Sequence, residues 1–407
     1  MYDKIKFIII KISTYCNLQC KYCYETGASK EKAVKFTLFK DLVKFLEKMP
    51  LAEDFEISIS GGEPSLCIDE FKEAYRQLRK IMRHKNIKLK LHTISNGTNI
   101  DGILDLLNND IVLPEQLNIS WDGLHSASKS RLVKNKKYDD EFFNNIIRKL
   151  GKQKYDYRKH ITIRTSATTD TIDELFDSYK FVTDCGCKRW DYYIINDEKN
   201  FNDPTYLNKI EEQLRKIYTY ARDNGLANDL VNLENMIYLY FNIDDQKSRE
   251  RHIVCRHLGE ALMINADGSI YPCTMGDSTS RFFTGIKFGD IFAGLDKKVM
   301  QDFADDYNQP PSCGLMYHGK PCEALHCFEC MMTCKYCNGS LQKKMMTQCD
   351  LRNLELRLFK EIFLDTGFKF EDSLVEKYKY IYKDFLDYNP VLNPNLPFKE
   401  NKNDDNT

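Results

Sequence analysis

The sequence lacks an excess of charge of either sign and lacks long hydrophobic runs. Lysine and arginine number 59 and aspartate and glutamate 60, which leaves a formal net charge of −1. Without a basic excess, a protein that coats nucleic acid or binds an anionic membrane surface is not indicated. The longest apolar run near the start, residues 7–10, is broken by Lys11, so we expect neither a signal peptide nor a membrane span. The expectation is a cytoplasmic protein with no nucleic-acid or membrane partner.

Cysteine, in contrast, is abundant. The chain has 15 cysteines, and nine of them lie between Cys255 and Cys349. A disulfide framework is typical of small secreted folds, which a chain of 407 residues without an expected secretory signal does not resemble. Closely spaced cysteines in a reducing compartment usually bind metal ions or iron–sulfur clusters. Most of these cysteines are therefore interpreted as ligands.

In the first half, short runs rich in β-branched residues alternate with segments of helical period. Strands are expected at residues 6–13, 55–60, 88–95, 117–120, 161–166 and 189–195, and helices at 38–46, 69–84, 139–153 and 172–186. Such alternation predicts an α/β fold whose parallel sheet curls, through right-handed crossovers, into an open, partial (β/α)6 barrel. Chemistry in such barrels lies at the carboxyl ends of the strands. Polar motifs follow the second, third and fourth strands at residues 61–64, 95–98 and 120–123.

Three cysteines follow the first strand, with the spacing Cys16-x3-Cys20-x2-Cys23. Three thiolates can hold a four-iron cluster and leave one iron open to bind another molecule. The alternative is a zinc site that takes its fourth ligand from elsewhere, and it is disfavoured because no histidine precedes His84. The missing fourth cysteine thus indicates an open coordination position.

This motif, with Tyr22 directly before the last cysteine, resembles the signature of the radical S-adenosylmethionine (radical SAM) enzymes. The resemblance implies a 4Fe–4S cluster whose open iron binds the amino and carboxylate groups of SAM. One electron from the cluster then cleaves the sulfonium, and the resulting 5′-deoxyadenosyl radical removes hydrogen from an unactivated C–H bond. A fourth cysteine would occupy the place of SAM.

Other strand ends are similar to the SAM site of that family. Residues 60–64 resemble its glycine-rich segment, in which glycine lets the backbone approach closely, and Ser120 and Arg131 match positions that bind the SAM carboxylate and ribose. The resemblance implies a SAM site made of Tyr22, Gly61, Gly62, Glu63, Pro64, Asn96, Ser120, Arg131 and Ser166. For Asn96 and Ser166, a capping or turn role remains an alternative.

The second cysteine block begins with Cys255-x12-Gly268-x4-Cys273 and resembles the SPASM extension of radical SAM enzymes. That extension carries two auxiliary 4Fe–4S clusters, so the resemblance implies three clusters in all. The implied ligands are Cys255, Cys273, Cys322 and Cys337 for the first auxiliary cluster, with Cys313 as an alternative to Cys322, and Cys327, Cys330, Cys334 and Cys349 for the second. The later spacings are tighter than the family pattern, and a zinc ribbon is the alternative. The remaining cysteines, at 67, 185 and 187, are interpreted as small buried apolar residues.

The expected organisation has five parts. They are a radical SAM partial barrel at 1–215, a helical linker at 216–250, a small cysteine-rich SPASM domain at 251–350, a C-terminal helical segment at 351–398 and a disordered tail at 399–407. Within the third part, Asp267 and Gly268 predict the turn of a hairpin. Asp277, just beyond Cys273, is the candidate catalytic acid or base.

SPASM enzymes mostly modify residues within peptides or proteins. The resemblance therefore implies an oxidoreductase that matures a ribosomally made precursor peptide by a thioether or carbon–carbon cross-link, with flavodoxin or ferredoxin as electron donor. An anaerobic sulfatase-maturing (formylglycine-generating) enzyme is the alternative, although residues 255–263 offer no further cysteine at the place where that class has a ligand. An iron–sulfur electron carrier or zinc scaffold is a third hypothesis, which gives no reason for the motif at 61–64.

Overall fold

Six parallel strands form the main part of a ten-stranded sheet. In spatial order they are β1 (Ile5–Ser13), β3 (Leu51–Gly61), β4 (Lys90–Ser95), β5 (Leu117–Ser120), β7 (Ile161–Ala167) and β8 (Arg189–Ile194). The structure is a computed structural model, and it describes residues 4–25, 34–108, 117–133, 137–153, 160–195, 204–241, 261–309, 316–322, 330–341, 346–375 and 394–399. All six expected strands are present, which confirms the α/β fold with a parallel sheet.

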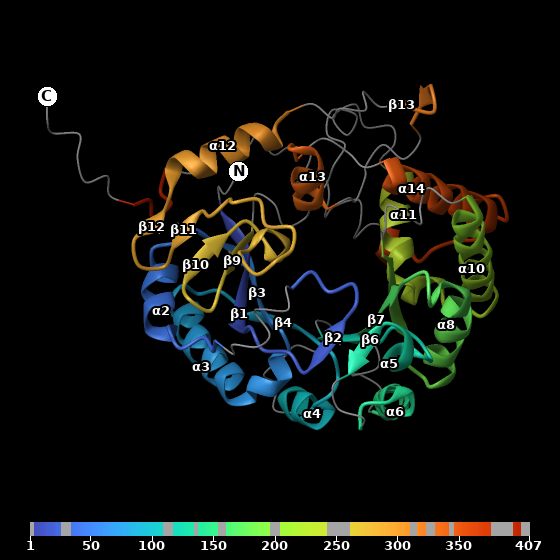
Figure 1. Ribbon diagram of the computed structural model, residues 1–407, viewed down its shortest axis with the longest axis horizontal. Helices are drawn as coiled ribbons and strands as arrows, with labels where there is room; N and C mark the ends of the chain where they lie inside the picture. Colours follow the sequence, from blue (N-terminus) through green and yellow to red (C-terminus); the bar gives the residue numbers. More distant parts are fainter. Residues whose placement is uncertain are drawn as a thin grey trace, which may run out of the picture.

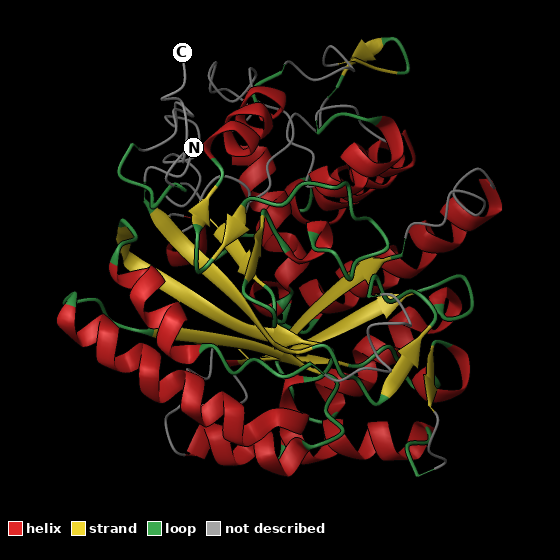
Figure 2. Ribbon diagram, turned by 60° about the vertical axis from the view of Figure 1, so that its left-hand side comes forward, coloured by secondary structure: helices red, strands yellow, loops and turns green. Residues whose placement is uncertain are grey.

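Helices separate these strands along the chain and lie in an arc outside the sheet (Figure 1). They are α2 (Phe39–Glu47), α3 (Ile68–His84), α4 (Ile100–Asn108), α6 (Asp140–Gly151), α8 (Leu175–Asp184) and α10 (Pro204–Asp223). Helix α3 shows why they pack there: Phe71, Leu78 and Ile81 recur at helical spacing and are buried. Figure 2 shows several of the red helices packed below the yellow sheet.

Alternation along each strand gives the sheet two different faces. Ile119, Ile163 and Trp190 are neighbours in register and buried, and Trp190 packs against Tyr179 of α8 with 4.8 Å between the ring centroids. Successive side chains of a strand point to opposite faces. The residues that follow each of these three therefore face the inside of the curved sheet, away from the helices.

The sheet continues on the other side of β1 through the second half of the chain. The added strands are β9 (Ala261–Ile264), which is parallel to β1, and the antiparallel β10 (Ser269–Tyr271), β11 (Gly289–Asp290) and β12 (Gly294–Leu295). Strands β9 and β10 form the expected hairpin, in which Gly268 has φ +85° and Ser269 N donates to Asp267 Oδ1 at 2.9 Å. This hairpin extends the barrel sheet through the pairing of β9 with β1, so the domain boundary expected near residue 251 does not separate two sheets. The division of the chain into domains stays a prediction.

The remaining described elements are shorter or lie later in the chain. They are β2 (Leu18–Cys20), β6 (Arg131–Val133), β13 (Met316–Tyr317), β14 (Lys320–Pro321), α5 (Ser126–Lys129), α11 (Val231–Phe241), α12 (Lys297–Tyr307), α13 (Met331–Asn338) and α14 (Met346–Phe359). One-turn 3-10 segments are η1 (Pro64–Cys67), η3 (Ile172–Glu174), η4 (Ala227–Asp229) and η6 (Thr274–Gly276), and a π-helix, η7 (Lys360–Leu364), continues α14. Of the expected tail at 399–407, residues 400–407 lie outside the described residues, as does the end of the expected linker, residues 242–250.

Helix α14 covers the start of the helical segment expected from residue 351 but begins earlier, at Met346, and it docks on the barrel. Tyr192 of β8 donates from its hydroxyl to Glu355 Oε1 of α14 at 2.9 Å, and its oxygen lies 2.8 Å from that of Tyr218 on α10. All three side chains are buried, so this small polar network joins the last barrel strand to the C-terminal helix.

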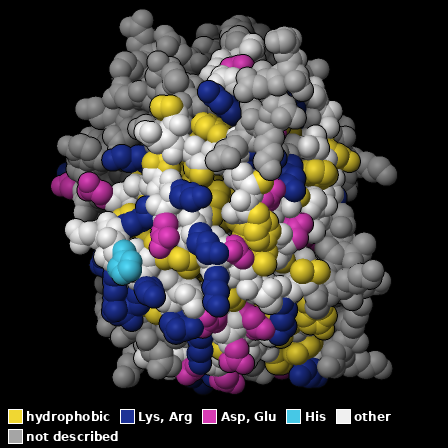
Figure 3. Space-filling model, turned by 90° about the vertical axis from the view of Figure 1, so that its left-hand side faces the viewer, with side chains coloured by type: hydrophobic (Ala, Val, Ile, Leu, Met, Phe, Trp, Pro, Cys, Tyr) yellow, Lys and Arg dark blue, Asp and Glu magenta, His cyan; other side chains and the backbone are white. Residues whose placement is uncertain are grey.

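The surface carries both signs of charge. On the face in Figure 3, lysine and arginine side chains are interspersed with aspartate and glutamate, in keeping with the balanced composition. No helix in the described ranges is both long and apolar enough to cross a membrane.

Candidate functional site

The first cysteine motif lies in the loop that leaves β1 and returns through β2. Cys16, Cys20 and Cys23 are all partly exposed. Strand β2 pairs with β6 in an antiparallel ladder that sets Cys20 opposite Arg131, and Lys21 N donates to the Ser130 carbonyl at 3.0 Å. The ladder therefore joins the cysteine loop to the segment that follows β5.

The sulfur of Cys16 accepts two hydrogen bonds. Leu18 N donates at 3.5 Å and Asn96 Nδ2 at 3.9 Å, and the same Asn96 nitrogen donates to Asn17 Oδ1 at 2.9 Å. Hydrogen bonds to ligand sulfurs are among the factors that set the potential of an iron–sulfur cluster. Asn96 therefore contacts the cysteine loop directly, whereas the sequence left open whether it serves the SAM site or only caps a turn.

The three cysteines of this loop are not arranged to bind a single metal ion. In the part of the chain that the structure describes, no three histidine, cysteine, aspartate or glutamate side chains converge to hold one metal ion. The role of the cysteines as cluster ligands stays a prediction from their loop and spacing.

The glycine-rich segment at the end of β3 packs directly on the cysteine loop. Gly62 N donates to the Ser13 carbonyl at 2.9 Å, and Glu63 N donates to the Tyr15 carbonyl at 2.8 Å. A Cβ atom on Gly61 would lie 2.3 Å from the Ser13 oxygen, and one on Gly62 would lie 2.2 Å from the Tyr15 oxygen. In this structure the glycines allow close approach of two backbone segments, whereas the sequence suggested close approach to a ligand.

Replacing Gly62 with alanine is expected to displace the cysteine loop. The new methyl group would overlap the backbone of Tyr15, and overpacking of this kind typically costs about 1–3 kcal/mol. Iron content after anaerobic reconstitution and the urea unfolding midpoint measure the effect. Gly367→Ala is the control for a glycine replacement without overlap, because nothing lies within 4 Å of the added Cβ, although its φ of +72° strains an L side chain. Equal iron content in Gly62→Ala and wild type would contradict the packing role.

Glu63 joins the ends of β3 and β4. Its Oε1 accepts from Ser65 N at 2.9 Å and from the Ser95 hydroxyl at 2.8 Å, and its Oε2 accepts from Asn96 N at 2.6 Å. Burial raises the pKa of Glu63, and these hydrogen bonds oppose that rise. Pro64 is buried at the start of η1. Contact of Glu63 with a SAM amino group stays a prediction, because its described partners are all within the protein.

A buried ion pair lies beside the cysteine loop. Arg131 Nε donates to Asp122 Oδ2 at 2.9 Å, and these two side chains are 3% and 0% exposed. Tyr22 donates its hydroxyl to the same carboxylate oxygen, and Ser166 N donates to Asp122 Oδ1 at 3.2 Å. Burial raises the pKa of Tyr22 well above its usual range, so this hydroxyl keeps its proton. Asp122 therefore gathers three of the predicted SAM residues around one carboxylate.

The Arg131 guanidinium keeps one buried nitrogen available. Its Nη1 atom is buried and has no hydrogen-bond partner among the described residues. Burial is the largest single influence and lowers the pKa of Arg131, but Asp122, Tyr22 and Cys20 together raise it well above its usual value. An unsatisfied, permanently charged donor is costly unless it binds an anion. A carboxylate placed at this nitrogen would satisfy it.

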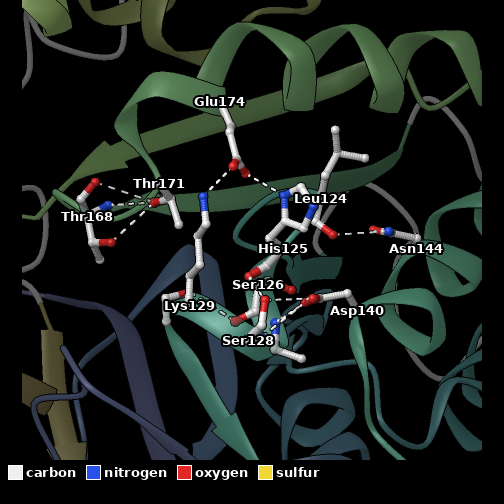
Figure 4. Close-up of polar contacts among 12 residues, drawn as sticks. Leu124, His125, Ser126, Ser128, Lys129, Asp140, Asn144, Thr168, Thr171 and Glu174 are labelled. Atoms are coloured by element: carbon white, nitrogen blue, oxygen red, sulfur yellow. Dashed lines mark hydrogen bonds and ion pairs between the residues drawn. The ribbon is translucent and has the colours of Figure 1, made fainter.

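Helix α5, which leads into Arg131, is held from two sides (Figure 4). Asp140 of α6 accepts from Ala127 N at 2.7 Å and from the Ser128 hydroxyl at 2.7 Å. On the other side, Glu174 of η3 accepts from His125 Nδ1 at 2.8 Å and from Lys129. The two carboxylates fix the short helix, and with it the position of Arg131.

Asp277 lies in a second buried charge cluster. The amino group of Lys11, on β1, lies 2.6 Å from Glu25 Oε1, Asp277 Oδ2 and the Thr279 hydroxyl, and both carboxylates are buried. The contact to Asp277 is an ion pair without directed hydrogen-bond geometry. This arrangement gives Asp277 a structural partner that the sequence did not suggest, and a catalytic role for it stays a prediction.

The same region ties the second cysteine block to the first. Arg281 N donates to the Tyr24 carbonyl at 2.8 Å, and Glu25 forms an isolated antiparallel bridge with Ser280. The loop after Cys273 therefore packs along the end of the cysteine loop that carries Cys23.

The other cysteines of the second block are placed in part. Cys330 caps α13, Cys334 is buried and Cys337 is exposed on the same helix, so these three share one helical face at spacings of four and three. Cys322 follows β14, and Cys349 is buried on α14. Predicted ligands at positions 255, 313 and 327 lie outside the described residues, and the division into two ligand sets stays a prediction.

Two residues of this arrangement were missed by sequence reasoning. Asp122 belongs to the noticed motif at 120–123 but was not assigned a role, although an aspartate directly after a buried strand end is a usable signal. Lys11 lies inside the apolar part of β1, between Ile10 and Ile12, and a charge flanked by apolar residues in a strand is the signal that it needs a buried partner.

The sequence is similar to several known proteins. Residues 10–182 match the model described as the radical SAM superfamily. An uncharacterised protein of Methanocaldococcus jannaschii is 24% identical over 280 residues, which is 67% of this chain and 86% of that protein. A cysteine-type anaerobic sulfatase-maturating enzyme of Clostridium novyi is 24% identical over 291 residues, which is 66% of this chain and 73% of that enzyme.

Solved structures share the fold. The structure of anSMEcpe with bound AdoMet (SAM) has a TM-score of 0.68 at 17% identity and covers 92% of this chain and 98% of that one. Streptococcus suis SuiB bound to SAM has a TM-score of 0.52 at 14% identity, covering 85% of this chain and 77% of that one. These likenesses extend beyond the parallel strands into the cysteine-rich second half.

Proposed function

Residues 10–182 make this chain a member of the radical SAM superfamily, and on that premise we propose that it is a peptide maturase. A 4Fe–4S cluster at Cys16, Cys20 and Cys23 and SAM at the adjoining strand ends are its proposed cofactors. The bound cluster would supply the electron that cleaves SAM into methionine and the 5′-deoxyadenosyl radical.

The observation that carries the SAM-binding part of this proposal is the buried, unsatisfied Nη1 of Arg131. The β2–β6 register sets Arg131 opposite Cys20, so a cationic donor lies beside a proposed cluster ligand. SAM presents a carboxylate at that place if its methionine part binds the open iron. The residues present therefore fit the cofactor.

Each residue of the site has a defined task in this proposal. Arg131 binds the SAM carboxylate, and Asp122 orients the guanidinium through its Nε atom. Tyr22 donates to Asp122 and fixes the loop just before Cys23. Asn96 donates to the Cys16 sulfur and so favours its thiolate form. Together these contacts hold the cysteine loop in one position before the cofactors bind.

The second cysteine block is proposed to hold two auxiliary 4Fe–4S clusters. They would accept the electron left on the substrate after hydrogen removal, and a reduced flavodoxin or ferredoxin would supply the first electron. The direct contact between the loop after Cys273 and the end of the first cysteine loop supports a functional connection between the two blocks.

Peptides are the proposed substrate class because two neighbours in fold were solved with them. Those structures are anSMEcpe with bound AdoMet and Kp18Cys peptide and SuiB bound to its precursor peptide SuiA. A cross-linking maturase and a sulfatase-maturing enzyme both fit, and the match to the Clostridium novyi enzyme favours the second as strongly as SuiB favours the first. Hydrazide reagents separate them, because formylglycine carries an aldehyde and a cross-link does not. Product mass alone is not sufficient, since a cross-link and the oxidation of a serine both remove two hydrogens.

Replacing Arg131 with glutamine is expected to weaken SAM binding about 10–100-fold, because a charge-assisted hydrogen bond contributes about 1.5–3 kcal/mol. Equilibrium dialysis of reconstituted protein against labelled SAM measures the change. Arg131→Lys keeps the charge and should recover part of the affinity. Arg148→Gln is the matched control, since Arg148 also pairs with a carboxylate, at 2.7 Å from Glu141, but lies on the outer helix α6. Unchanged SAM affinity in Arg131→Gln at full iron content would contradict this assignment.

A further inference from the structure

A second arginine–aspartate pair lies on the inner face of the sheet, outside the cluster site. Arg164 of β7 and Asp191 of β8 are opposite one another in the strand register, and Arg164 Nε donates to Asp191 Oδ2 at 2.8 Å. Their neighbours Ile163 and Trp190 point toward the helices. Alternation therefore directs this pair into the hollow of the curved sheet.

This part of the inner face is open. The side chain of Arg164 is 48% exposed, although it lies on a strand with neighbours on both sides. Two large side chains of other strands, Tyr193 at 51% and Ile94 at 39%, are exposed as well. Interior strands such as β4 and β7 normally bury residues like Ile94 and Arg164 on a covered face, while Tyr193 lies on the edge strand β8. Their exposure identifies a surface prepared for a ligand that carries apolar and charged groups.

The open surface is continuous with the proposed cofactor site. In the strand register, Ser120 neighbours Arg164, and Ser166 neighbours Tyr193. Ser120 and Ser166 are predicted SAM residues, and Ser166 also donates through its backbone to Asp122. A ligand on Arg164 and Tyr193 would therefore lie next to SAM.

The geometry of Arg164 favours an anion. Its Nε edge is held by Asp191, whose side chain is only 14% exposed, while its two terminal nitrogens donate to none of the described residues. A guanidinium held in this way presents two parallel N–H groups that match a carboxylate. Arg131 differs, because it is buried and its available atom lies at the cysteine loop.

We propose that Arg164, oriented by Asp191, recognises a carboxylate of the peptide substrate, with Tyr193 and Ile94 packing against the apolar side chains next to it. The carboxylate would belong to an acidic residue near the modified position or to the peptide C-terminus. This inference rests on the proposed function, since it requires a peptide beside SAM.

Selection from peptide pools tests the proposal. One pool contains octapeptides that are randomised, acetylated and amidated, and the other has the same composition with a free C-terminus. Each pool is incubated under anaerobic conditions with immobilised, cluster-loaded protein and SAM. Mass spectrometry then identifies the peptides that stay bound. We expect wild type to enrich peptides with aspartate or glutamate, or those with the free C-terminus, about tenfold, which corresponds to one well-formed contact. Arg164→Gln should lose the enrichment and Arg148→Gln should keep it.

Three results would overturn the inference: no preference for carboxylates in wild type, a preference that survives in Arg164→Gln, or a loss of SAM affinity in that variant, which would assign Arg164 to the cofactor. Formation of 5′-deoxyadenosine without peptide separates this failure from that of the proposed function. If wild type and Arg164→Gln both form 5′-deoxyadenosine but wild type shows no preference for carboxylates, only the role of Arg164 in substrate recognition is contradicted.

Discussion

Replacing Cys16, Cys20 and Cys23 together with alanine is expected to abolish SAM cleavage completely. Three thiolates are the proposed protein ligands of the first cluster, so iron content should fall by about four atoms per chain. The remaining iron should stay, because the ligands proposed for the auxiliary clusters are untouched. Iron and sulfide analysis measures the loss, and chromatography of 5′-deoxyadenosine after anaerobic reduction measures the activity.

The control for this variant is Cys185→Ala. Cys185 is also partly exposed, it caps the end of α8, and burial raises its thiol pKa, which is unfavourable for a thiolate ligand. This variant should keep wild-type iron and activity. A triple variant that still forms 5′-deoxyadenosine, or that loses iron no more than Cys185→Ala does, would contradict the ligand assignment.

Lys11→Met is expected to be the most destabilising single change, at about 3–5 kcal/mol, because it leaves buried charges without their partner. Lys11 is 1% exposed and lies 2.6 Å from both Glu25 and Asp277, which are buried as well. Methionine fills similar space but cannot compensate two carboxylates. Anaerobic urea unfolding of the cluster-loaded protein, followed by circular dichroism, measures the change in the midpoint.

Two further variants separate charge from packing at this cluster. Lys11→Met combined with Glu25→Gln and Asp277→Asn removes the unpaired charges and should recover part of the lost stability. Lys44→Met is the surface control, since its pair with Asp41 is 73% and 38% exposed and such pairs contribute about 0–1 kcal/mol. If Lys11→Met unfolds at the same urea concentration as Lys44→Met, the buried cluster does not stabilise the fold as described.

The strands of the barrel and the cysteine loop could be predicted because their signals are local. Runs such as residues 6–13 and 161–166 are rich in β-branched residues, and the spacing of Cys16, Cys20 and Cys23 is itself the motif. Helix α3 could also be predicted, because its apolar residues recur with a period of 3.6.

The contacts that organise the site could not be predicted, because they join residues far apart in the chain. Strands β2 and β6 have three residues each, too short to show a pattern, yet their ladder sets Cys20 opposite Arg131. Lys11 meets Asp277 after a separation that no local pattern can encode. The Arg164–Asp191 pair depends on the register of two parallel strands, which the sequence leaves open.

The central claim is that this chain cleaves SAM reductively at an open iron of a cluster held by three cysteines. Its most direct test is the anaerobic incubation of reconstituted wild-type protein with dithionite and SAM, followed by quantification of products. We expect 5′-deoxyadenosine and methionine in equal amounts, with neither formed when reductant is omitted. A protein with its full complement of iron that binds SAM but forms no 5′-deoxyadenosine would contradict the account.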